Sequence, residues 1–493
     1  MLIPIDLPPG QYRNGTILQS MGRWRDASLV RFYQGTVRPV GGWQAFSSDN
    51  TTEKPRKVHA WRTNSGGQWL AVSAANELFV YDQNGTQLDI TPAALSGASG
   101  FENAALANGY GGGNYGGGAY GSDSTTASRV LPATIWSLAN FGQELLACSD
   151  DDGRIFKWAL DTAAPAVLVA NAPTGNTGIA VTQERFVLAL GAGGDTRKVQ
   201  WCDREDYDTW TPLATNEAGD FVLNTVGEIK CAIPLRGQTL ILTDNDAHVA
   251  SFVGAPLVYE FEQAGQSCGV ISKNAAEAVG NAVYWMGLGG FYAYQGGQVA
   301  ELPCEVSDYV FSDISSFYRS HISAVQISEF SEIWWFYPSA SATENDRYVT
   351  LNYAQGTWQT GTLSRTAGVD RGVFLYPVMT GADLVVYNHE KSTVPAGFPV
   401  YAETGPISLG AGETTFTARR VYTDEDTQGG VKLTFKTKRH PNGPETVSPP
   451  YTPENPTGVR FTGRQIVMRV EGNEGEDWRV GVQRIEGEPR GRR

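Results

Sequence analysis

Short paired runs of strand-forming residues recur along the middle of this chain, and no other feature of the sequence constrains the fold as strongly. In every unit but the last, two apolar segments rich in Val, Ile, Trp, Tyr and Phe flank a turn rich in Asp, Asn or Gly. The segments are residues 69–73 with 77–81, 144–149 with 154–158, 185–190 with 198–201, 239–243 with 247–252, 282–286 with 289–294, 332–337 with 348–353, and 381–387. Units begin about every 45 to 65 residues, so one structural element is repeated along the chain.

The repeat predicts an all-β protein built around a β-propeller of about six to seven blades. A single four-stranded blade cannot bury both of its faces, whereas blades stacked in a ring bury them and leave only short edges. The 57 Gly, 25 Pro and 13 Trp residues agree with a fold of strands and tight turns. An open β-sandwich, or two stacked sandwiches, is the alternative that the repeat leaves open.

Changes in composition divide the chain. Strand signals after residue 395 no longer follow the repeat, and we expect them to form a C-terminal β-sandwich with a Pro-rich loop at residues 441–456. The predicted divisions are an N-terminal arm with the first strands at 1–55, the propeller at 56–395 with an insertion at 96–128, and the C-terminal β-sandwich at 396–493.

The insertion contains a low-complexity Gly/Tyr segment at residues 109–121 that cannot pack a core. Tyr110, Tyr115 and Tyr120 are spaced five apart, which suits contacts with a partner surface. A flexible spacer explains the segment equally well, and both interpretations stay open.

Charge is distributed unevenly around a net value of −14. Residues 1–62 hold 9 basic and 4 acidic side chains, and residues 397–493 hold 14 and 13. The middle of the chain therefore holds 15 basic and 35 acidic residues. A region with such an excess of acidic residues is expected to repel nucleic acid. This charge argues against a DNA-binding domain. It remains compatible with a pore through which DNA slides without sticking.

No pattern typical of catalysis or of metal binding stands out. The five His residues lie far apart, the five Cys residues never form a C-x-x-C pair, and no phosphate-binding loop occurs. Ser149, Asp151 and Gly153 match a sialidase-type Asp-box, but such a box is a structural turn away from the catalytic centre, and the match departs at Ile155 and Phe156. We therefore predict that the protein is not an enzyme, with no catalytic residues, no cofactor and no metal site.

Carboxylates are also dense at residues 203–212. Their spacing does not match an EF-hand loop. We expect a solvated loop with Trp210 packed beneath it rather than a calcium site.

Several stretches together resemble the packaged-DNA stabilisation, or tail hub (nozzle), proteins of short-tailed bacteriophages. These stretches are residues 5–10, 12–16, 22–26, 29–33, 41–43, 189–194, 199–201, 209–212, 463–464, 478–481 and 491–493. The resemblance implies propellers with extra β-domains that form a hexameric ring below the portal and adaptor. It brings no catalytic residues with it.

The resemblance implies a structural virion protein of the tail, assembled in the host bacterial cytoplasm. Its expected partners are copies of itself in a hexamer, adaptor and portal-side tail proteins, tail fibres or spikes, and double-stranded DNA that passes without specific binding. A fibre-connecting, neck or head-decoration protein is the alternative within that class. A glycan-binding or glycan-hydrolysing propeller is the alternative outside it.

The N-terminal segment supplies further interface candidates. Arg23 and Arg25, with other arginines of residues 13–38, can bind a neighbouring acidic subunit, with Trp24 and Trp43 as anchors. Burial of both tryptophans in the first blade is the other interpretation. The opening residues have no basic and apolar pattern of a signal peptide, and no run is long enough to span a membrane, so we expect neither.

Overall fold

The computed structural model describes residues 1–95, 100–108, 127–408, 414–440, 443–473 and 475–491. In this part of the chain nearly all regular structure is β-strand, with one short α-helix, α1 (Ser307–Asp313). Five 3-10 helices are η1 (Ile17–Ser20), η2 (Ala93–Leu95), η3 (Ala192–Gly194), η4 (Arg319–His321) and η5 (Ser328–Phe330). The all-β prediction is confirmed.

Seven four-stranded antiparallel sheets, here called ring sheets I to VII, account for most of these strands. Sheet I is β6 (Lys57–Arg62), β7 (Gln68–Ser73), β8 (Leu78–Asp82) and β9 (Gln87–Asp89); sheet II is β12 (Trp136–Phe141), β13 (Glu144–Ser149), β14 (Ile155–Trp158) and β15 (Val167–Leu168). Sheet III is β16 (Gly178–Val181), β17 (Val187–Leu190), β18 (Lys198–Trp201) and β19 (Gly219–Val222); sheet IV is β20 (Ile229–Leu235), β21 (Gln238–Thr243), β22 (Ala247–Gly254) and β23 (Val258–Gly265).

The remaining ring sheets follow in chain order, except for one strand. Sheet V is β24 (Ala276–Val279), β25 (Ala282–Met286), β26 (Phe291–Gln295) and β27 (Gln298–Leu302); sheet VI is β28 (Ser323–Ile327), β29 (Glu332–Tyr337), β30 (Arg347–Asn352) and β31 (Thr357–Thr362). Sheet VII is β32 (Ala367–Val369), β33 (Val378–Thr380), β34 (Val386–His389) and β5 (Trp43–Ala45). An N-terminal strand thus completes the last sheet.

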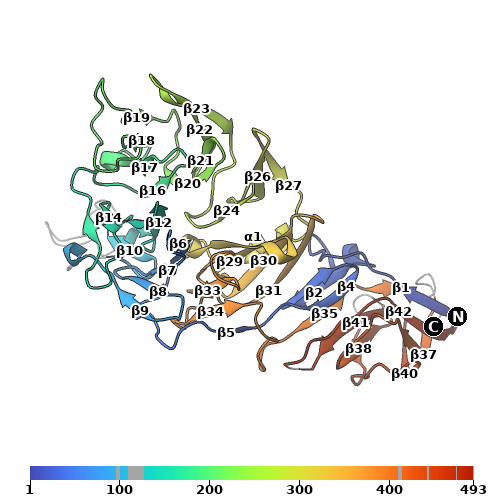
Figure 1. The fold of residues 1–493 in the computed structure, drawn as a ribbon. Coiled ribbons are helices and arrows are strands. Elements are labelled where there is room, and N and C mark those ends of the chain that lie inside the picture. The colour runs from blue at the N-terminus through green and yellow to red at the C-terminus, as the bar shows by residue number, and fades with distance from the viewer. Residues whose placement is uncertain (96–99, 109–126, 409–413, 441–442, 474, 492–493) are drawn as a thin grey trace, which may run out of the picture.

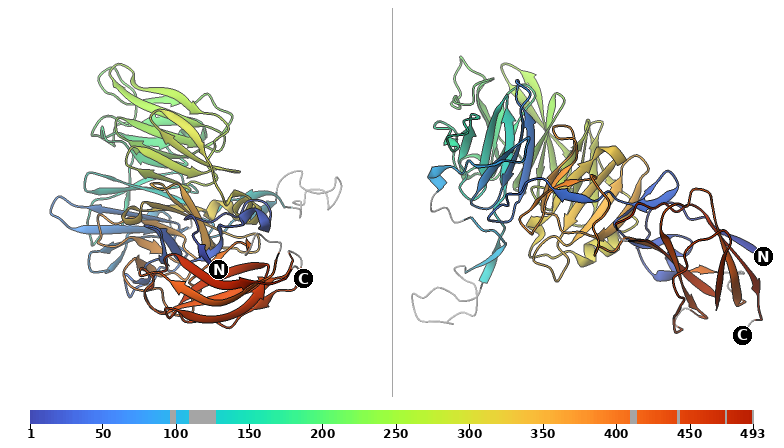
Figure 2. Two further views of the ribbon diagram at one scale, coloured as in Figure 1. Left: turned by 90° about the vertical axis from the view of Figure 1, so that its right-hand side faces the viewer. Right: turned by 60° about the horizontal axis from the view of Figure 1, so that its bottom comes forward.

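The ring sheets close on themselves. The first strand of each sheet contacts the first strand of the next, and β32 of sheet VII contacts β6 of sheet I. The sheets therefore surround a common axis, which Figures 1 and 2 show as a fan of sheets at one end of the molecule. Radial four-stranded sheets around an axis define a β-propeller, so the prediction of an all-β protein built around a propeller is confirmed.

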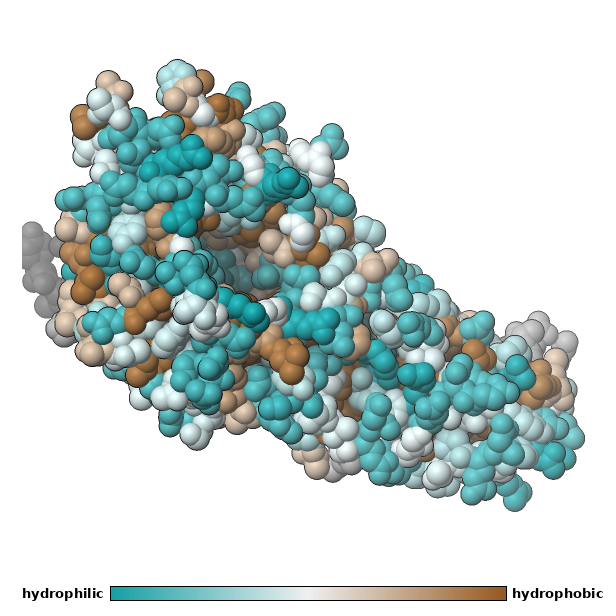
Figure 3. All heavy atoms as spheres, in the orientation of Figure 1, coloured by the Kyte–Doolittle hydropathy of each residue, from teal (hydrophilic) through white to brown (hydrophobic). Residues whose placement is uncertain are grey.

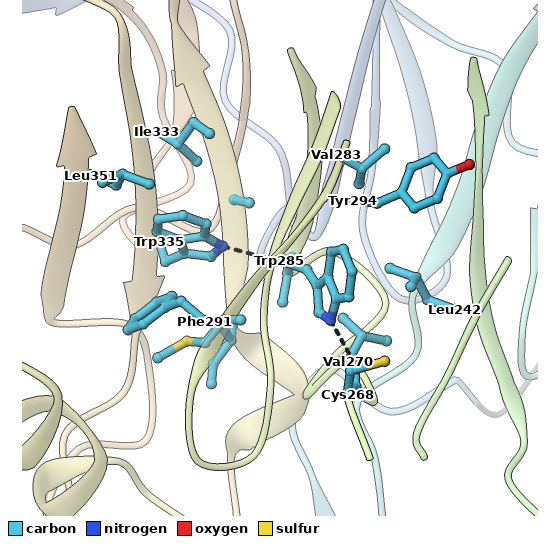
Figure 4. Close-up of a cluster of buried hydrophobic side chains, with 14 of the residues drawn as sticks. Leu242, Cys268, Val270, Val283, Trp285, Phe291, Tyr294, Ile333, Trp335 and Leu351 are labelled. Atoms are coloured by element: carbon cyan, nitrogen blue, oxygen red, sulfur yellow. Dashed lines mark hydrogen bonds between the residues drawn. The ribbon is translucent and has the colours of Figure 1, made fainter. Parts of the chain in front are cut away.

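Tryptophans connect neighbouring ring sheets. The Trp335 indole N–H of sheet VI donates to the Ala275 carbonyl of sheet V at 2.9 Å, and the Trp285 N–H donates to the Cys268 carbonyl at 2.7 Å. Both rings are fully buried among aliphatic and aromatic side chains (Figure 4). Each tryptophan thus fills the space between sheets while its one polar atom is satisfied.

The two ends of the chain meet in a second body, here called the terminal module. One of its sheets is β1 (Leu2–Ile5), β42 (Gln483–Pro489), β37 (Phe416–Thr423) and β40 (Thr457–Gly463). The other is β2 (Trp24–Ser28), β35 (Tyr401–Thr404), β41 (Gln465–Gly472), β38 (Val431–Lys438) and β39 (Thr446–Val447), with β36 (Ile407–Ser408) paired to β41. Two hairpins, β3 (Val30–Tyr33) with β4 (Thr36–Pro39) and β10 (Ala105–Asn108) with β11 (Ala127–Leu131), complete the strands.

The two sheets of the terminal module share one core. Every second residue of β38 is buried, as is every second residue of β40, which is the pattern of strands with one face inward. Inward side chains from both sheets, among them Phe416, Phe435, Phe461 and Met468, pack together. The segment 1–55, which the sequence set apart as an arm, is therefore divided: β1 and β2 belong to the terminal module and β5 to ring sheet VII.

A buried ion cluster, here called the Arg31 clamp, joins the terminal module to the ring. Arg31, on β3, donates to both oxygens of Glu332 at 3.1 and 3.2 Å and to both oxygens of Glu390 at 2.6 and 3.0 Å. The indole of Trp334 and the Gly41 amide each donate a further bond at 2.9 Å. Phe32 and Val37 of the same hairpin belong to the core of the terminal module, so the clamp ties that module to sheets VI and VII.

The clamp leaves two carboxylates facing one guanidinium in a site that excludes water. Burial by itself would lower the pKa of Arg31, but Glu332 and Glu390 raise it above the ordinary value. Burial raises the pKa of Glu332, although Arg31 and the Trp334 indole act in the other direction. The arginine therefore stays charged, and its removal would leave two carboxylates buried without a cation.

Replacing Arg31 with Met is expected to lower the free energy of unfolding by about 3–5 kcal/mol, because a buried pair loses its cation. Urea unfolding followed by tryptophan fluorescence measures this loss. Arg419→Met is the matched control: its pair with Glu488 is exposed (60% and 57%), and a change below about 1 kcal/mol is expected. Equal losses in the two variants would show that the clamp contributes no more than a surface ion pair.

Candidate functional site

A pocket of about 420 Å³ lies on one face of the ring, and we call it the axial pocket. Its walls are the loops that precede the first strands of several ring sheets and the turns between second and third strands. The lining residues are Val130, Pro132, Ala133, Ile135, Asp150, Glu228, Lys230, Asp244, Val270, Ile271, Ser272, Lys273, Leu288, Ser316, Phe317, Arg319 and Ser320. In the orientation of Figure 3 the surface of the ring is hollowed near its centre.

Lys273 crosses this face of the ring. It precedes β24 of sheet V, yet its ammonium lies 2.6 Å from a carboxylate oxygen of Asp150 in sheet II. The same nitrogen donates to the Thr177 carbonyl, just before sheet III, at 2.8 Å. Since sheet V neighbours neither of them in the ring, Lys273 links opposite parts of the propeller and fixes the floor of the axial pocket.

Two further bonds cross the same face. The side-chain amide of Asn274 donates to the backbone carbonyl of Arg56 at 2.7 Å and so joins sheet V to the start of sheet I. The backbone N–H of Ala133 donates to the side-chain hydroxyl oxygen of Ser320 at 3.4 Å and joins sheet II to the loop before sheet VI. The face of the ring that carries the axial pocket is thus cross-linked by side chains.

Beside the axial pocket lies a second buried cluster. Both terminal nitrogens of Arg56, which is 2% exposed, donate to Glu344, at 2.7 and 2.8 Å. The His321 ring lies 3.6 Å from the same carboxylate. Burial and the nearby Arg56 lower the pKa of His321 to about 4 despite the pull of Glu344, so this imidazole is neutral at pH 7.

A third group of ionisable residues lines the first strands. Glu277 on β24 is half-buried, and burial raises the pKa of its carboxyl to about 7, a rise that Asp370 adds to and Lys57 opposes. Lys57 lies on β6 and Asp370 follows β32, so charges from three ring sheets converge near the axis. Within the described part of the chain Glu277 forms no ion pair.

Burial also raises the pKa of the Cys231 thiol to about 12, which keeps this thiol protonated.

Four of the interface candidates from the sequence are described by the structure. Trp24 is buried in the core of the terminal module, and Trp43 is buried against sheet VII, where it stacks on His389. Arg23 forms an ion pair with Glu305, and Arg25 donates weakly to the Thr16 carbonyl at 3.5 Å. Burial and the nearby Arg13 lower the pKa of Arg25.

Tyr110, Tyr115 and Tyr120 lie outside the described residues. The hairpin of β10 and β11 leads into and out of their segment, and Val130 at its end lines the axial pocket.

The Asp-box match occupies the turn between β13 and β14. Ser149 is buried, and its carbonyl accepts a bond from the Gly153 amide at 2.8 Å, with Gly153 at φ +71°, a conformation that favours glycine. Asp151, the central residue of the match, is exposed. Its neighbour Asp150, which the sequence analysis did not single out, is the residue that reaches the axial pocket. Nothing in the run of three aspartates distinguishes it.

The loop at residues 203–212 is built as expected around a buried tryptophan. Trp210 is 3% exposed, and its indole N–H donates to the Tyr207 carbonyl at 2.6 Å.

Across the residues that the structure describes, no three His, Cys, Asp or Glu side chains come together as a metal site. All five cysteines are free, three of them buried and two half-buried. No helix in the described ranges is long and apolar enough to cross a membrane.

Comparison with known proteins gives a likeness of fold without a family. No family model matches the chain, and no curated protein matches it. Similar solved structures include a streptogramin B lyase (10% identity, TM-score 0.40, 70% of this chain and 96% of that one) and virginiamycin B lyase from Staphylococcus aureus (6%, 0.41, 70% and 98%). The WD40 β-propeller domain of Doa1 is another (9%, 0.39, 71% and 98%).

The prediction that the chain is not an enzyme is corrected by this comparison. It treated a propeller without a recognisable motif as a non-catalytic body, yet two of the similar structures are lyases. The fold class therefore does not exclude catalysis, because function depends on the site that a fold carries. At TM-scores of 0.40 and 0.41 the likeness assigns no reaction to this chain.

Replacing Lys273 with Met is expected to cost about 1–3 kcal/mol of unfolding free energy, because Asp150 and the Thr177 carbonyl lose a charged donor. Hydrogen exchange at residues 271–275 should also become faster. Lys230→Met is the control in the same pocket: its partners Glu228 and Asp244 are 56% and 42% exposed, so a change below about 1 kcal/mol is expected. Unchanged exchange in the Lys273 variant would mean that the link does not hold this face together.

Replacing Glu277 with Gln is expected to stabilise the protein at pH 8 and to leave it unchanged at pH 4. The pKa of Glu277 is about 7 in the folded chain against 4.5 for the free group, so the folded state holds the proton more tightly and stability falls as pH rises through that window. The gain at pH 8 should be roughly 1–3 kcal/mol. Urea unfolding at both pH values measures it, with exposed Glu425→Gln as control. A gain of equal size at pH 4 would contradict the assignment.

Proposed function

We propose that the protein is the tail hub, or nozzle, of a short-tailed bacteriophage, in which six copies form a ring around the path of the DNA below the portal and adaptor. The observation that carries the proposal is the Arg31 clamp, which holds two β-bodies as one elongated piece. A rigid connection between the ring and the terminal module is what we expect of a structural component that transmits force within a larger assembly. The resemblance of the short sequence stretches to tail hub proteins supports the same role.

We infer that the seven ring sheets are the seven blades of one propeller. We also infer that the two sheets of the terminal module are a β-sandwich, because they share one core and carry alternating inward residues. In this interpretation β5 closes the propeller and β1 and β2 complete the sandwich. Both bodies then depend on the N-terminal segment, so neither separates without unfolding the other.

The proposed DNA path lies between copies and not through a single propeller. The bonds of Lys273, Asn274 and Ser320 cross one face of the ring, which leaves no open axial passage there for a duplex. The middle of the chain, with 35 acidic and 15 basic residues, would present DNA with like charge. Such a wall lets a polyanion pass without binding it.

The proposed partners are the adaptor and portal-side proteins on one side of the ring and fibres or spikes on its rim. The Gly/Tyr segment of residues 109–121 is a candidate contact for one of them. Five free cysteines support assembly in a reducing cytoplasm. A fibre-connecting, neck or head-decoration role would use the same architecture.

A glycan-binding propeller is the second candidate, and the axial pocket favours it. The pocket holds about 420 Å³ and combines an aromatic ring, Phe317, with exposed Arg319 and carboxylates. Small-ligand pockets combine apolar walls with a few polar groups in this way.

Electron microscopy and mass photometry of the purified full chain test the proposed function. Closed rings of six are expected, with no measurable binding of a 30-base-pair duplex at physiological salt. A chain that remains monomeric at every accessible concentration would reject the hub. Binding of host surface polysaccharide that is lost in Arg319→Ala would instead establish the glycan-binding candidate.

A further inference from the structure

An uncharged apolar hairpin tip projects from ring sheet IV. Strands β22 and β23 have eight residues each and are the longest in the ring. Their connection, with the sequence Val-Gly-Ala-Pro-Leu at residues 253–257, exposes Leu257 by 70% and Val253 by 49%. Solvent-facing apolar residues concentrated at one tip mark a contact surface. In Figure 3 hydrophobic residues gather at the upper end of the ring, over β22 and β23.

The terminal module carries an apolar groove at the other end of the molecule. This groove encloses about 460 Å³, and its apolar walls are Ile17 and Leu18 of η1, Pro406 and Val467. Ile17 is 56% exposed and Leu18 44% exposed, so the groove is uncovered in the single chain. Figures 1 and 2 place β22 and β23 at one end and the terminal module at the other. The tip of a chain therefore cannot reach its own groove.

Charge on the two surfaces is complementary. Residues 247–265, which form the hairpin, include the exposed carboxylates Glu260 and Glu262 and no Lys or Arg. Residues 431–439 beside the groove hold four basic side chains and no acidic one, and Lys436 and Lys438 line the groove itself. Lys436 pairs with Glu403, and Lys438 pairs with Glu445, which also lines the groove. The positive charge that remains uncompensated among the described residues beside the groove is that of Lys432 and Arg439. The remaining field favours an acidic hairpin over a basic one.

We propose that the hairpin tip at residues 253–257 inserts into the groove between Ile17, Leu18, Pro406 and Val467 of a second copy of this chain. Tip and groove are different surfaces, so each copy offers one of each and the contact is head-to-tail. Such heterologous contacts generate closed rings when the rotation between copies closes. The inference rests on the proposed ring and names the surfaces that build it.

Two single substitutions separate the surfaces. Leu257→Asp places a charge at the apolar tip, and Ile17→Asp places a charge in the apolar groove. Both side chains are exposed, so each variant is expected to keep its fold. Near-ultraviolet circular dichroism verifies that the fold is retained. Each variant alone is expected to be monomeric by mass photometry, with self-association at least tenfold weaker than that of the unmodified chain. Leu375→Asp, 77% exposed and outside both surfaces, should form rings like the unmodified protein.

Mixing the two variants gives the decisive measurement. The Ile17 variant keeps its tip and the Leu257 variant keeps its groove, so an equimolar mixture should form heterodimers and nothing larger. Raising the salt from 50 to 500 mM should weaken this dimer, because its charge complementarity is screened.

The outcomes distinguish the inference from the proposed function. Rings formed by both variants would overturn the tip-to-groove contact and leave the hub standing, whereas a monomeric unmodified chain would reject both. Vesicles of phosphatidylcholine and phosphatidylglycerol test a lipid surface as the occupant. Binding to them that Leu257→Asp abolishes, with rings intact, would show that the tip serves a membrane and would also overturn the contact.

Discussion

One guanidinium between two carboxylates holds the architecture together. Arg31 lies in the hairpin that follows β2, and its bidentate bonds to Glu332 and Glu390 fix that hairpin against ring sheets VI and VII. Arg meets this requirement and Lys does not, because a planar fork of donors can satisfy two carboxylates at once. The Trp334 indole and the Gly41 amide satisfy further oxygen atoms of the cluster. Together with the bond from the Leu29 amide to the Tyr348 hydroxyl and the ion pair of Arg23 with Glu305, this cluster couples the terminal module to the ring.

The ring itself is stiffened in two different ways. Between neighbouring sheets the contact is apolar: tryptophans such as Trp285 and Trp335 fill the space between the sheets. The indole N–H of each of the two donates to a backbone carbonyl. Across the axis the link is polar, and Lys273 reaches Asp150 from a sheet that is not adjacent. Apolar packing resists separation of blades because water would enter the gap. A charged tie across the face resists changes in ring shape, and it defines the floor of the axial pocket.

Much of the fold could be predicted, but little of the candidate site. Apolar runs on either side of turn residues identified the two central strands of ring sheets I to VI. For sheet VII the single predicted segment, 381–387, falls mostly on the turn between β33 and β34. By contrast, Asp150 looks like its neighbours Asp151 and Asp152 in sequence, and only the fold brings it 2.6 Å from Lys273, 123 residues away. The prediction of a non-enzymatic protein does not stand, because the absence of a local motif does not exclude a site assembled from distant loops.

The amino-acid sequence alone determined the local elements: which segments are strands, where they turn, and that they repeat. These properties depend on backbone preferences and hydrophobic period, which act over a few residues. Tertiary structure alone decided that β1, β2 and β5 leave the N-terminal segment for three different sheets, and that Trp24 and Trp43 are buried by partners more than 300 residues away. Such pairings depend on which edges remain free once the ring has closed, and no short-range pattern carries that information.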